Sequence, residues 1–307
     1  MKVIYLGTPE FGVLPLEKLL KSHHNVIAVV SQPDRPAGRG YKLISPPIVN
    51  TAKENNIPVY QFKSIKKEGV EILKNLKPDV MVTAAYGQIL SKEILEIAPH
   101  GVINVHGSLL PKYRGAAPIQ WAIINGETKT GITIMQTAEG LDNGDMILKK
   151  EVNIEPNDNA VTLTKKMSQV GADALLEALD LIEQGKATFT PQDESQSSYY
   201  PMLTKDLGKI DWSKSAQEIN CLIRGLYDWP GTYSTLWGVK FKIIEAEVNS
   251  KSYPVKPGTI VNLDKYITVM CGKDCLNILK IQEQNGKAMS TVDYLRGHKR
   301  YIGERFE

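Results

Sequence analysis

Three polar side chains in this sequence suit the transfer of an acyl group. Asn104 and His106 are two residues apart in an apolar segment, 102–106, that predicts a β-strand, so both side chains leave the same face. Asp142 follows 36 residues after His106, in the turn-forming run Gly-Leu-Asp-Asn-Gly-Asp. If a loop brings Asp142 to the far nitrogen of the imidazole, the ring stays protonated and offers a charged N–H to a developing oxyanion. Such a trio can pass an acyl group to an amine without a covalent nucleophile.

Nucleophilic and metal chemistry fit the sequence less well. Ser108 lacks the Gly-x-Ser-x-Gly turn that exposes a catalytic serine. The three cysteines lie in the last third of the chain, and their odd number argues against a disulfide framework. Because Cys271 and Cys275 lack a second pair of ligands, we expect no metal site. His23 and His24 lie in a polar loop and are expected to be exposed.

The turn after the first predicted strand, residues 7–12, also excludes a function class. Pro9 stands where the dinucleotide-binding pattern Gly-x-Gly-x-x-Gly has its second glycine, and no acidic residue closes the second strand. A nicotinamide-dependent oxidoreductase is therefore disfavoured.

The elements that must position the trio alternate between strands and helices. Strands are expected at 2–6, 25–31, 59–60, 79–83, 102–106, 131–137 and 146–152, and helices at 11–22, 46–55, 66–76, 91–97 and 162–184. This α/β alternation predicts a Rossmann-like, doubly wound parallel sheet with helices on both faces. Ligands of such sheets gather beyond the carboxyl ends of the strands, where His106 would lie.

The remainder of the chain has a different pattern. Residues 186–204 are polar and aperiodic and are interpreted as a linker. Ser215 and Glu218 form a capping box that opens a helix reaching Tyr227. Short strands follow at 233–236, 239–248, 259–262, 267–271 and 276–282, which indicates a small barrel or sandwich. We therefore predict a domain over 1–188, a linker over 189–205 and a second domain over 206–307.

Several motifs together resemble the folate-dependent formyltransferases. Asn-x-His, the run Ser-Leu-Leu-Pro-x-x-Arg-Gly at 108–115 and the distant Asp142 form the pattern of that superfamily, whose members move a formyl group from 10-formyltetrahydrofolate to an amine. The loop 32–40 is similar to the branch whose acceptor is the methionine carried by initiator tRNA. The resemblance implies an OB-like barrel for the second domain, binding to tRNA, and no metal.

The resemblance also implies roles for individual residues. Asn104 would hold the formyl oxygen, His106 would stabilise the oxyanion, and Asp142 would help to move the amine proton towards N10 of the folate. The folate pocket is expected at the following residues: Tyr86, Gly87, Gln88, Ile89, Leu90, Ser108, Leu109, Leu110, Pro111, Glu139 and Gly140.

The segment 33–47 is the predicted tRNA contact of the first domain. Its composition, rich in Gly and Pro with basic side chains, indicates a mobile loop that can approach a phosphate backbone. Arg39 is the first candidate, supported by Arg35 and Lys42.

Size and composition agree with a two-domain enzyme. The chain has 307 residues, 42% of them hydrophobic and 23% charged, and a net charge of +3 that does not by itself indicate nucleic acid. Because neither a signal peptide nor a membrane span is evident, we expect a cytoplasmic protein. We also expect a monomer. Two alternatives stay open: a formyltransferase for a small amine, such as an amino sugar nucleotide or glycinamide ribonucleotide, and an RNA-binding protein without catalysis.

Overall fold

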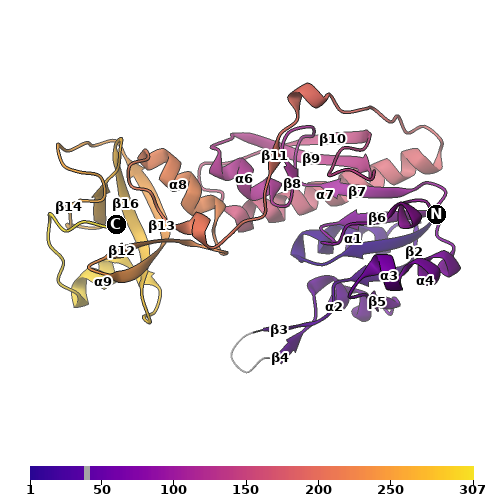
Figure 1. Cartoon of the computed structure of the whole chain (residues 1–307), viewed down its shortest axis with the longest axis horizontal. Helices are drawn as coiled ribbons and strands as arrows, with labels where there is room; N and C mark the ends of the chain where they lie inside the picture. The colour runs from indigo at the N-terminus through magenta and orange to yellow at the C-terminus, as the bar shows by residue number, and fades with distance from the viewer. Residues whose placement is uncertain (38–41) are drawn as a thin grey trace. The chain divides into compact units, whose positions relative to one another are not determined.

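The computed structural model describes residues 1–37 and 42–307, so the predicted tRNA contact Arg39 lies outside the described residues. The chain forms two compact units that do not follow chain order (Figure 1). Unit 1 contains Met1–Gly115, Lys129–Asn153 and Thr164–Tyr200, and unit 2 contains Ala116–Thr128, Ile154–Leu163 and Pro201–Glu307. The functional boundaries at residues 188 and 206 stay a prediction.

A mostly parallel sheet forms the centre of unit 1 (Figure 1). Its order is β10-β9-β7-β6-β1-β2-β5. The strands are β1 (Lys2–Gly7), β2 (Asn25–Ser31), β5 (Val59–Gln61), β6 (Val80–Ala84), β7 (Val102–His106), β9 (Lys129–Gln136) and β10 (Met146–Asn153). The strands from β7 to β5 pair in parallel, whereas β9 runs antiparallel to both β7 and β10. The parallel part has the Rossmann order, which confirms the predicted doubly wound fold.

Both faces of this sheet are buried, as expected for parallel strands. The alternate residues Ile4 and Leu6 of β1 pack in one apolar cluster with Ile65, Leu73 and Ile94. These last three come from α3 (Ile65–Glu68), α4 (Val70–Leu76) and α5 (Lys92–Leu95). The remaining helices are α1 (Val13–Leu20), α2 (Pro47–Glu54) and the long α7 (Ala160–Glu183). Each fully buried aliphatic side chain contributes roughly 1.5–3 kcal/mol to the free energy of folding. These packed side chains therefore stabilise the strands that carry the candidate site.

The loop predicted to contact tRNA contains a short hairpin. β3 (Arg35–Ala37) pairs antiparallel with β4 (Lys42–Ile44), with Arg35 opposite Ile44. The structure therefore adds regular pairing at the base of a segment that composition alone indicates to be a mobile loop.

Unit 2 contains a curled antiparallel half-barrel, in agreement with the predicted small barrel. Its strands are β12 (Thr232–Leu236), β13 (Val239–Asn249), β14 (Ile260–Asn262), β15 (Ile267–Met270), β16 (Cys275–Glu283) and β17 (Met289–Ser290). Its helices are α6 (Pro118–Ile124), α8 (Ala216–Gly225) and α9 (Thr291–Gly297). The capping box of Ser215 and Glu218 opens α8, as predicted. Trp212, Phe241, Tyr294 and Phe306 pack in the core of the half-barrel.

Among the residues that the structure describes, no helix is long and apolar enough to cross a membrane.

Candidate active site

Asn104 lies on β7 beside Thr83 of β6, to which it is paired in parallel register. The Thr83 hydroxyl donates a hydrogen bond to Asn104 Oδ1 at 2.9 Å. Because the amide oxygen is used in this way, the amide NH₂ is the group left to donate to a ligand. Strand alternation places His106 on the same face of β7, as the sequence predicts.

His106 is 5% exposed and has neighbours at both ring nitrogens. Nε2 lies 3.0 Å from the carbonyl oxygen of Tyr113. Since a carbonyl can only accept, Nε2 carries a hydrogen, and Nδ1 is the nitrogen that can face a substrate. Nδ1 lies 3.7 Å from Asp142 Oδ1, which is an ion-pair separation when the ring is protonated but is too long for a hydrogen bond.

This arrangement differs from the expected one in a single respect. The sequence-based prediction places Asp142 on the nitrogen opposite to the reacting group, but the Tyr113 carbonyl occupies that position. The reason is local, because Tyr113 adopts φ 60° in the turn after β7 and so its carbonyl can approach the ring. Asp142 therefore lies on the Nδ1 side of His106, which is the side that the Tyr113 carbonyl leaves open.

Asp142 is held in a strained turn. Its φ is 48°, a left-handed conformation that Asp tolerates better than most residues. Asp142 Oδ2 accepts a hydrogen bond from the backbone N–H of Gly115 at 2.8 Å. Gly144 packs so closely on the end of the preceding strand, β9, that a Cβ there would lie 1.8 Å from the carbonyl oxygen of Gln136. The turn therefore leaves Oδ1 of Asp142 as the oxygen that faces His106.

The predicted folate loop 108–111 is fixed next to His106. Thr133, which pairs with His106 across β7 and β9, donates from its hydroxyl to the Ser108 carbonyl at 2.7 Å and accepts from the Leu110 N–H at 3.0 Å. The Ser108 hydroxyl is buried and donates to the Lys112 carbonyl at 2.7 Å. Leu110 and Pro111 are also buried, whereas Leu109 is half-buried.

The second predicted folate segment, 86–90, follows β6. Tyr86 is buried, its burial raises the pKa of the phenol, and its hydroxyl has no hydrogen-bond partner among the described residues. Gly87 has φ 86°, a backbone conformation that glycine adopts without strain. Gln88 donates to the Phe62 carbonyl at 2.9 Å, which assigns its side chain to loop packing. Ile89 is 87% exposed and Leu90 is half-buried.

The other predicted contacts lie on the surface. Glu139 and Gly140 are exposed in the bend before Asp142. Arg35 is exposed on β3, and Lys42 begins β4.

Sequence reasoning missed three residues that hold the Asp142 turn: Arg114, Gln192 and Glu194. Arg114 belongs to a recognised motif but received no role, and the other two lie in the segment interpreted as a linker. That segment contributes a short strand, β11 (Tyr199–Tyr200), which pairs in parallel with β8 (Arg114–Gly115). Arg114 could have indicated these contacts, because an arginine beside a buried strand needs polar partners from elsewhere in the chain.

The expectation that His24 is exposed is wrong. His24 is 4% exposed, its pKa is lowered by burial, and its Nε2 lies 3.0 Å from Asp180 Oδ1 at the end of α7. His23, which is exposed, lies 2.8 Å from Glu183. The four side chains have the chemistry of metal ligands, and their ligand atoms lie within 4.8 Å of one another.

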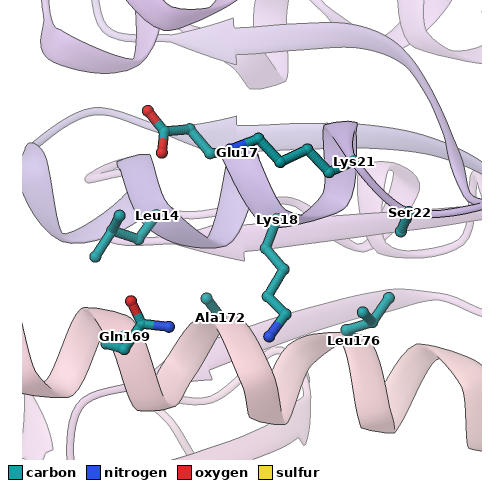
Figure 2. Close-up of a pocket in the computed structure, with 8 residues that line it drawn as sticks. All are labelled: Leu14, Glu17, Lys18, Lys21, Ser22, Gln169, Ala172 and Leu176. Carbon is teal, nitrogen blue, oxygen red and sulfur yellow. The ribbon is translucent and has the colours of Figure 1, made fainter.

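A surface hollow of about 340 Å³ lies away from the trio, between α1 and α7. Figure 2 shows Lys18 pointing from α1 towards α7, where Gln169, Ala172 and Leu176 line the other wall. The predicted catalytic and folate-binding residues do not line it. The hollow is therefore a groove between surface helices rather than the predicted folate site.

The chain is similar to formyl transferases over most of its length. The family model described as formyl transferase matches residues 1–179, and the model described as formyl transferase, C-terminal domain, matches residues 202–299. The methionyl-tRNA formyltransferase of Alkaliphilus oremlandii (strain OhILAs) is 49% identical over 97% of this chain and 97% of its own length. That of Clostridioides difficile (strain 630) is 48% identical over the same shares.

A solved structure adds evidence on the fold. The N-formyltransferase from Helicobacter canadensis, in complex with folinic acid and dTDP-3-aminofucose, superposes with a TM-score of 0.70 and 21% identity, covering 91% of this chain and 99% of that chain. At this identity the likeness concerns the fold alone. The two family matches and the near-complete alignment with relatives mean that the chain belongs to the formyl transferase family, alongside the methionyl-tRNA formyltransferases.

Proposed function

We propose that this enzyme transfers the formyl group of 10-formyltetrahydrofolate to the α-amino group of methionyl-tRNA. The observation that carries the proposal is the arrangement at the end of β7, where the Asn104 amide NH₂, Nδ1 of His106 and Oδ1 of Asp142 are all left available to a ligand. The near-full-length relatives named methionyl-tRNA formyltransferase support the choice of acceptor.

The reaction follows from these groups. The Asn104 NH₂ and protonated Nδ1 of His106 hold the formyl oxygen, while the methionyl amine attacks the formyl carbon. A C–N bond forms and the carbonyl oxygen becomes an oxyanion, which both donors stabilise. Asp142 offsets the positive charge of the imidazolium and passes the amine proton, directly or through water, towards N10 of the folate. The bond from the carbon to N10 then breaks, which gives N-formylmethionyl-tRNA and tetrahydrofolate.

The folate is assigned to the two loops that flank the trio. Residues 108–111 are rigid through Thr133, and 86–90 combine a buried tyrosine with the exposed backbone of Gly87. A flat ring system is held by such apolar walls and accessible backbone groups. The folinic acid named with the Helicobacter canadensis relative is consistent with this assignment.

Initiator tRNA is assigned to two surfaces. The segment 33–47 contains the basic residues Arg35, Arg39 and Lys42, whose type suits contacts with phosphates or base edges. The half-barrel of unit 2 has an OB-like form, which suits single-stranded nucleic acid. We further propose a cytoplasmic monomer whose formyl transfer needs no metal.

The alternative acceptor is an amino sugar nucleotide, favoured only by the likeness in fold to the Helicobacter canadensis protein. A competition between the two acceptors, methionyl-tRNA and the amino sugar nucleotide, distinguishes these functions. The full chain is incubated with 10-formyltetrahydrofolate and with equal concentrations of initiator methionyl-tRNA and dTDP-3-aminofucose, and both formylated products are measured. We expect formylmethionyl-tRNA to exceed the sugar product by about 100-fold or more, on the order of the discrimination that dedicated contacts provide. A dominant sugar product would overturn the proposal.

A further inference from the structure

Arg114 is an arginine buried at a sheet edge with every side of its guanidinium engaged. Its side chain has no exposed area. The Nη1 and Nη2 groups donate to the two carboxylate oxygens of Glu194 at 3.0 and 2.7 Å, which is the bidentate geometry that favours an arginine over a lysine. Nη1 also donates to the Tyr199 hydroxyl. The hydrogen bond to Glu194 is the main cause of a raised pKa of Arg114, so the group stays charged.

The same guanidinium fixes the orientation of a neighbouring amide. Nε and Nη2 of Arg114 donate to Gln192 Oε1 at 3.0 and 2.8 Å. Since an arginine only donates, the amide oxygen of Gln192 must face it and the NH₂ must face the other way. That NH₂ donates to the backbone carbonyls of Asp142 and Gly144, each at 2.8 Å.

The contacts close a ring around Asp142. The N–H of Gly115, which follows Arg114 in β8, donates to Asp142 Oδ2 at 2.8 Å. The two adjacent residues of β8 therefore hold Asp142 twice: Gly115 holds the carboxylate directly, and Arg114 holds the backbone carbonyl through Gln192. The three residues that precede Asp142, at 139–141, are exposed, so packing does not fix this part of the turn.

We propose that Arg114 and Gln192 are positioning residues, which act through Asp142 to set the distance between its Oδ1 and Nδ1 of His106. This inference rests on the proposed formyl transfer. The left-handed backbone of Asp142 is held by the two hydrogen bonds that the Gln192 amide donates to the turn. Without them the turn relaxes and the carboxylate leaves the imidazole.

The test is Gln192→Glu in the full chain, compared with Gln196→Glu as a matched control. The new carboxylate would keep one oxygen for Arg114 but would turn its second oxygen, in place of the NH₂, towards two carbonyls. Gln196 is exposed, bonds Asp193 of its own segment, and undergoes the same change of charge. We expect Gln192→Glu to lower kcat by about 10–100-fold, because a displacement near 1 Å has this effect, with KM for the folate and for methionyl-tRNA within about 2-fold. The control should match the wild type.

A double-mutant cycle distinguishes positioning from a merely structural role. In an Asp142→Asn background, Gln192→Glu should reduce kcat by less than about 3-fold, because the group that it positions is already lost. Gln192→Met, which is neutral and lacks both donors, should give the same pattern if the glutamate variant folds poorly.

Two results would overturn the inference: an unchanged kcat in both Gln192 variants, or equal losses in the wild-type and Asp142→Asn backgrounds. A wild-type enzyme that fails to formylate methionyl-tRNA would instead overturn the proposed function.

Discussion

Replacing Asp142 with asparagine removes one negative charge and leaves the shape of the turn intact. The asparagine oxygen can still accept the Gly115 N–H that now binds Oδ2 at 2.8 Å. What is lost is the charge 3.7 Å from Nδ1 of His106. At that distance two unit charges attract by about 4 kcal/mol in a partly solvated site, which sets an upper limit near ~1,000-fold in rate. Loss of one donor to an oxyanion typically costs roughly 100- to 1,000-fold in kcat, so we expect a decrease of about that size.

The assay is formyl transfer to methionyl-tRNA at saturating folate, with the dissociation constant of the folate measured separately. Folate affinity should remain within about 3-fold of the wild-type value, because the lost interaction belongs to the transition state. Asp145→Asn, three residues along the same loop, is the control for the change of charge and should retain activity. A folded Asp142→Asn enzyme with more than about a tenth of the wild-type kcat would refute the reasoning.

Thr83→Val keeps the side-chain shape but removes the hydroxyl that orients the Asn104 amide, so kcat in the transfer assay should fall by about 10-fold. An unchanged kcat would contradict this orienting role of Thr83. Gly144→Ala places a Cβ 1.8 Å from the Gln136 carbonyl and should displace the catalytic turn. It should lower kcat by at least about 10-fold, as misplaced catalytic groups do, while retention of full activity would show that the turn adapts. Glu194→Gln should lower the melting temperature near pH 7, because the guanidinium partner lowers the pKa of the carboxyl and the folded state therefore favours its charged form. The difference from the wild type should shrink as the pH falls through that lowered pKa, and a difference that grows in acid would contradict the sign.

Sequence periodicity predicted the features of the site that depend on regular structure. The two-residue period of a strand places Asn104 and His106 on one face of β7. The alternation of strands and helices implies that β7 ends at the edge of the sheet where ligands bind. The pairing of Thr83 with Asn104 is a consequence of sheet register, which no local pattern specifies. The sequence therefore indicated the amide but not the hydroxyl that orients it.

The features that escaped prediction depend on irregular backbone and on contacts distant in sequence. The carbonyl at Nε2 of His106 comes from the left-handed Tyr113, a conformation that a turn-forming sequence permits but does not require. Gln192 lies in a polar, aperiodic stretch, which has the same composition whether it is a linker or the partner of a buried arginine. His24 is buried and contacts Asp180 near the end of α7. This contact is distant in sequence, so the polarity of the loop around His24 could not predict it.

The most direct test of the account is the single-turnover rate of formyl transfer in His106→Gln, with both substrates bound at saturation. The amide NH₂ of the glutamine replaces the Nε2–H that donates to the Tyr113 carbonyl, but the variant has no group in place of Nδ1. His106→Asn has the opposite effect, because its amide NH₂ is a neutral donor near the position of Nδ1 and no group replaces Nε2. We predict a loss of about 100-fold or more in His106→Gln with normal folate binding, and a smaller loss in His106→Asn. A wild-type rate in folded His106→Gln would contradict the assignment of Nδ1 as the group that stabilises the oxyanion.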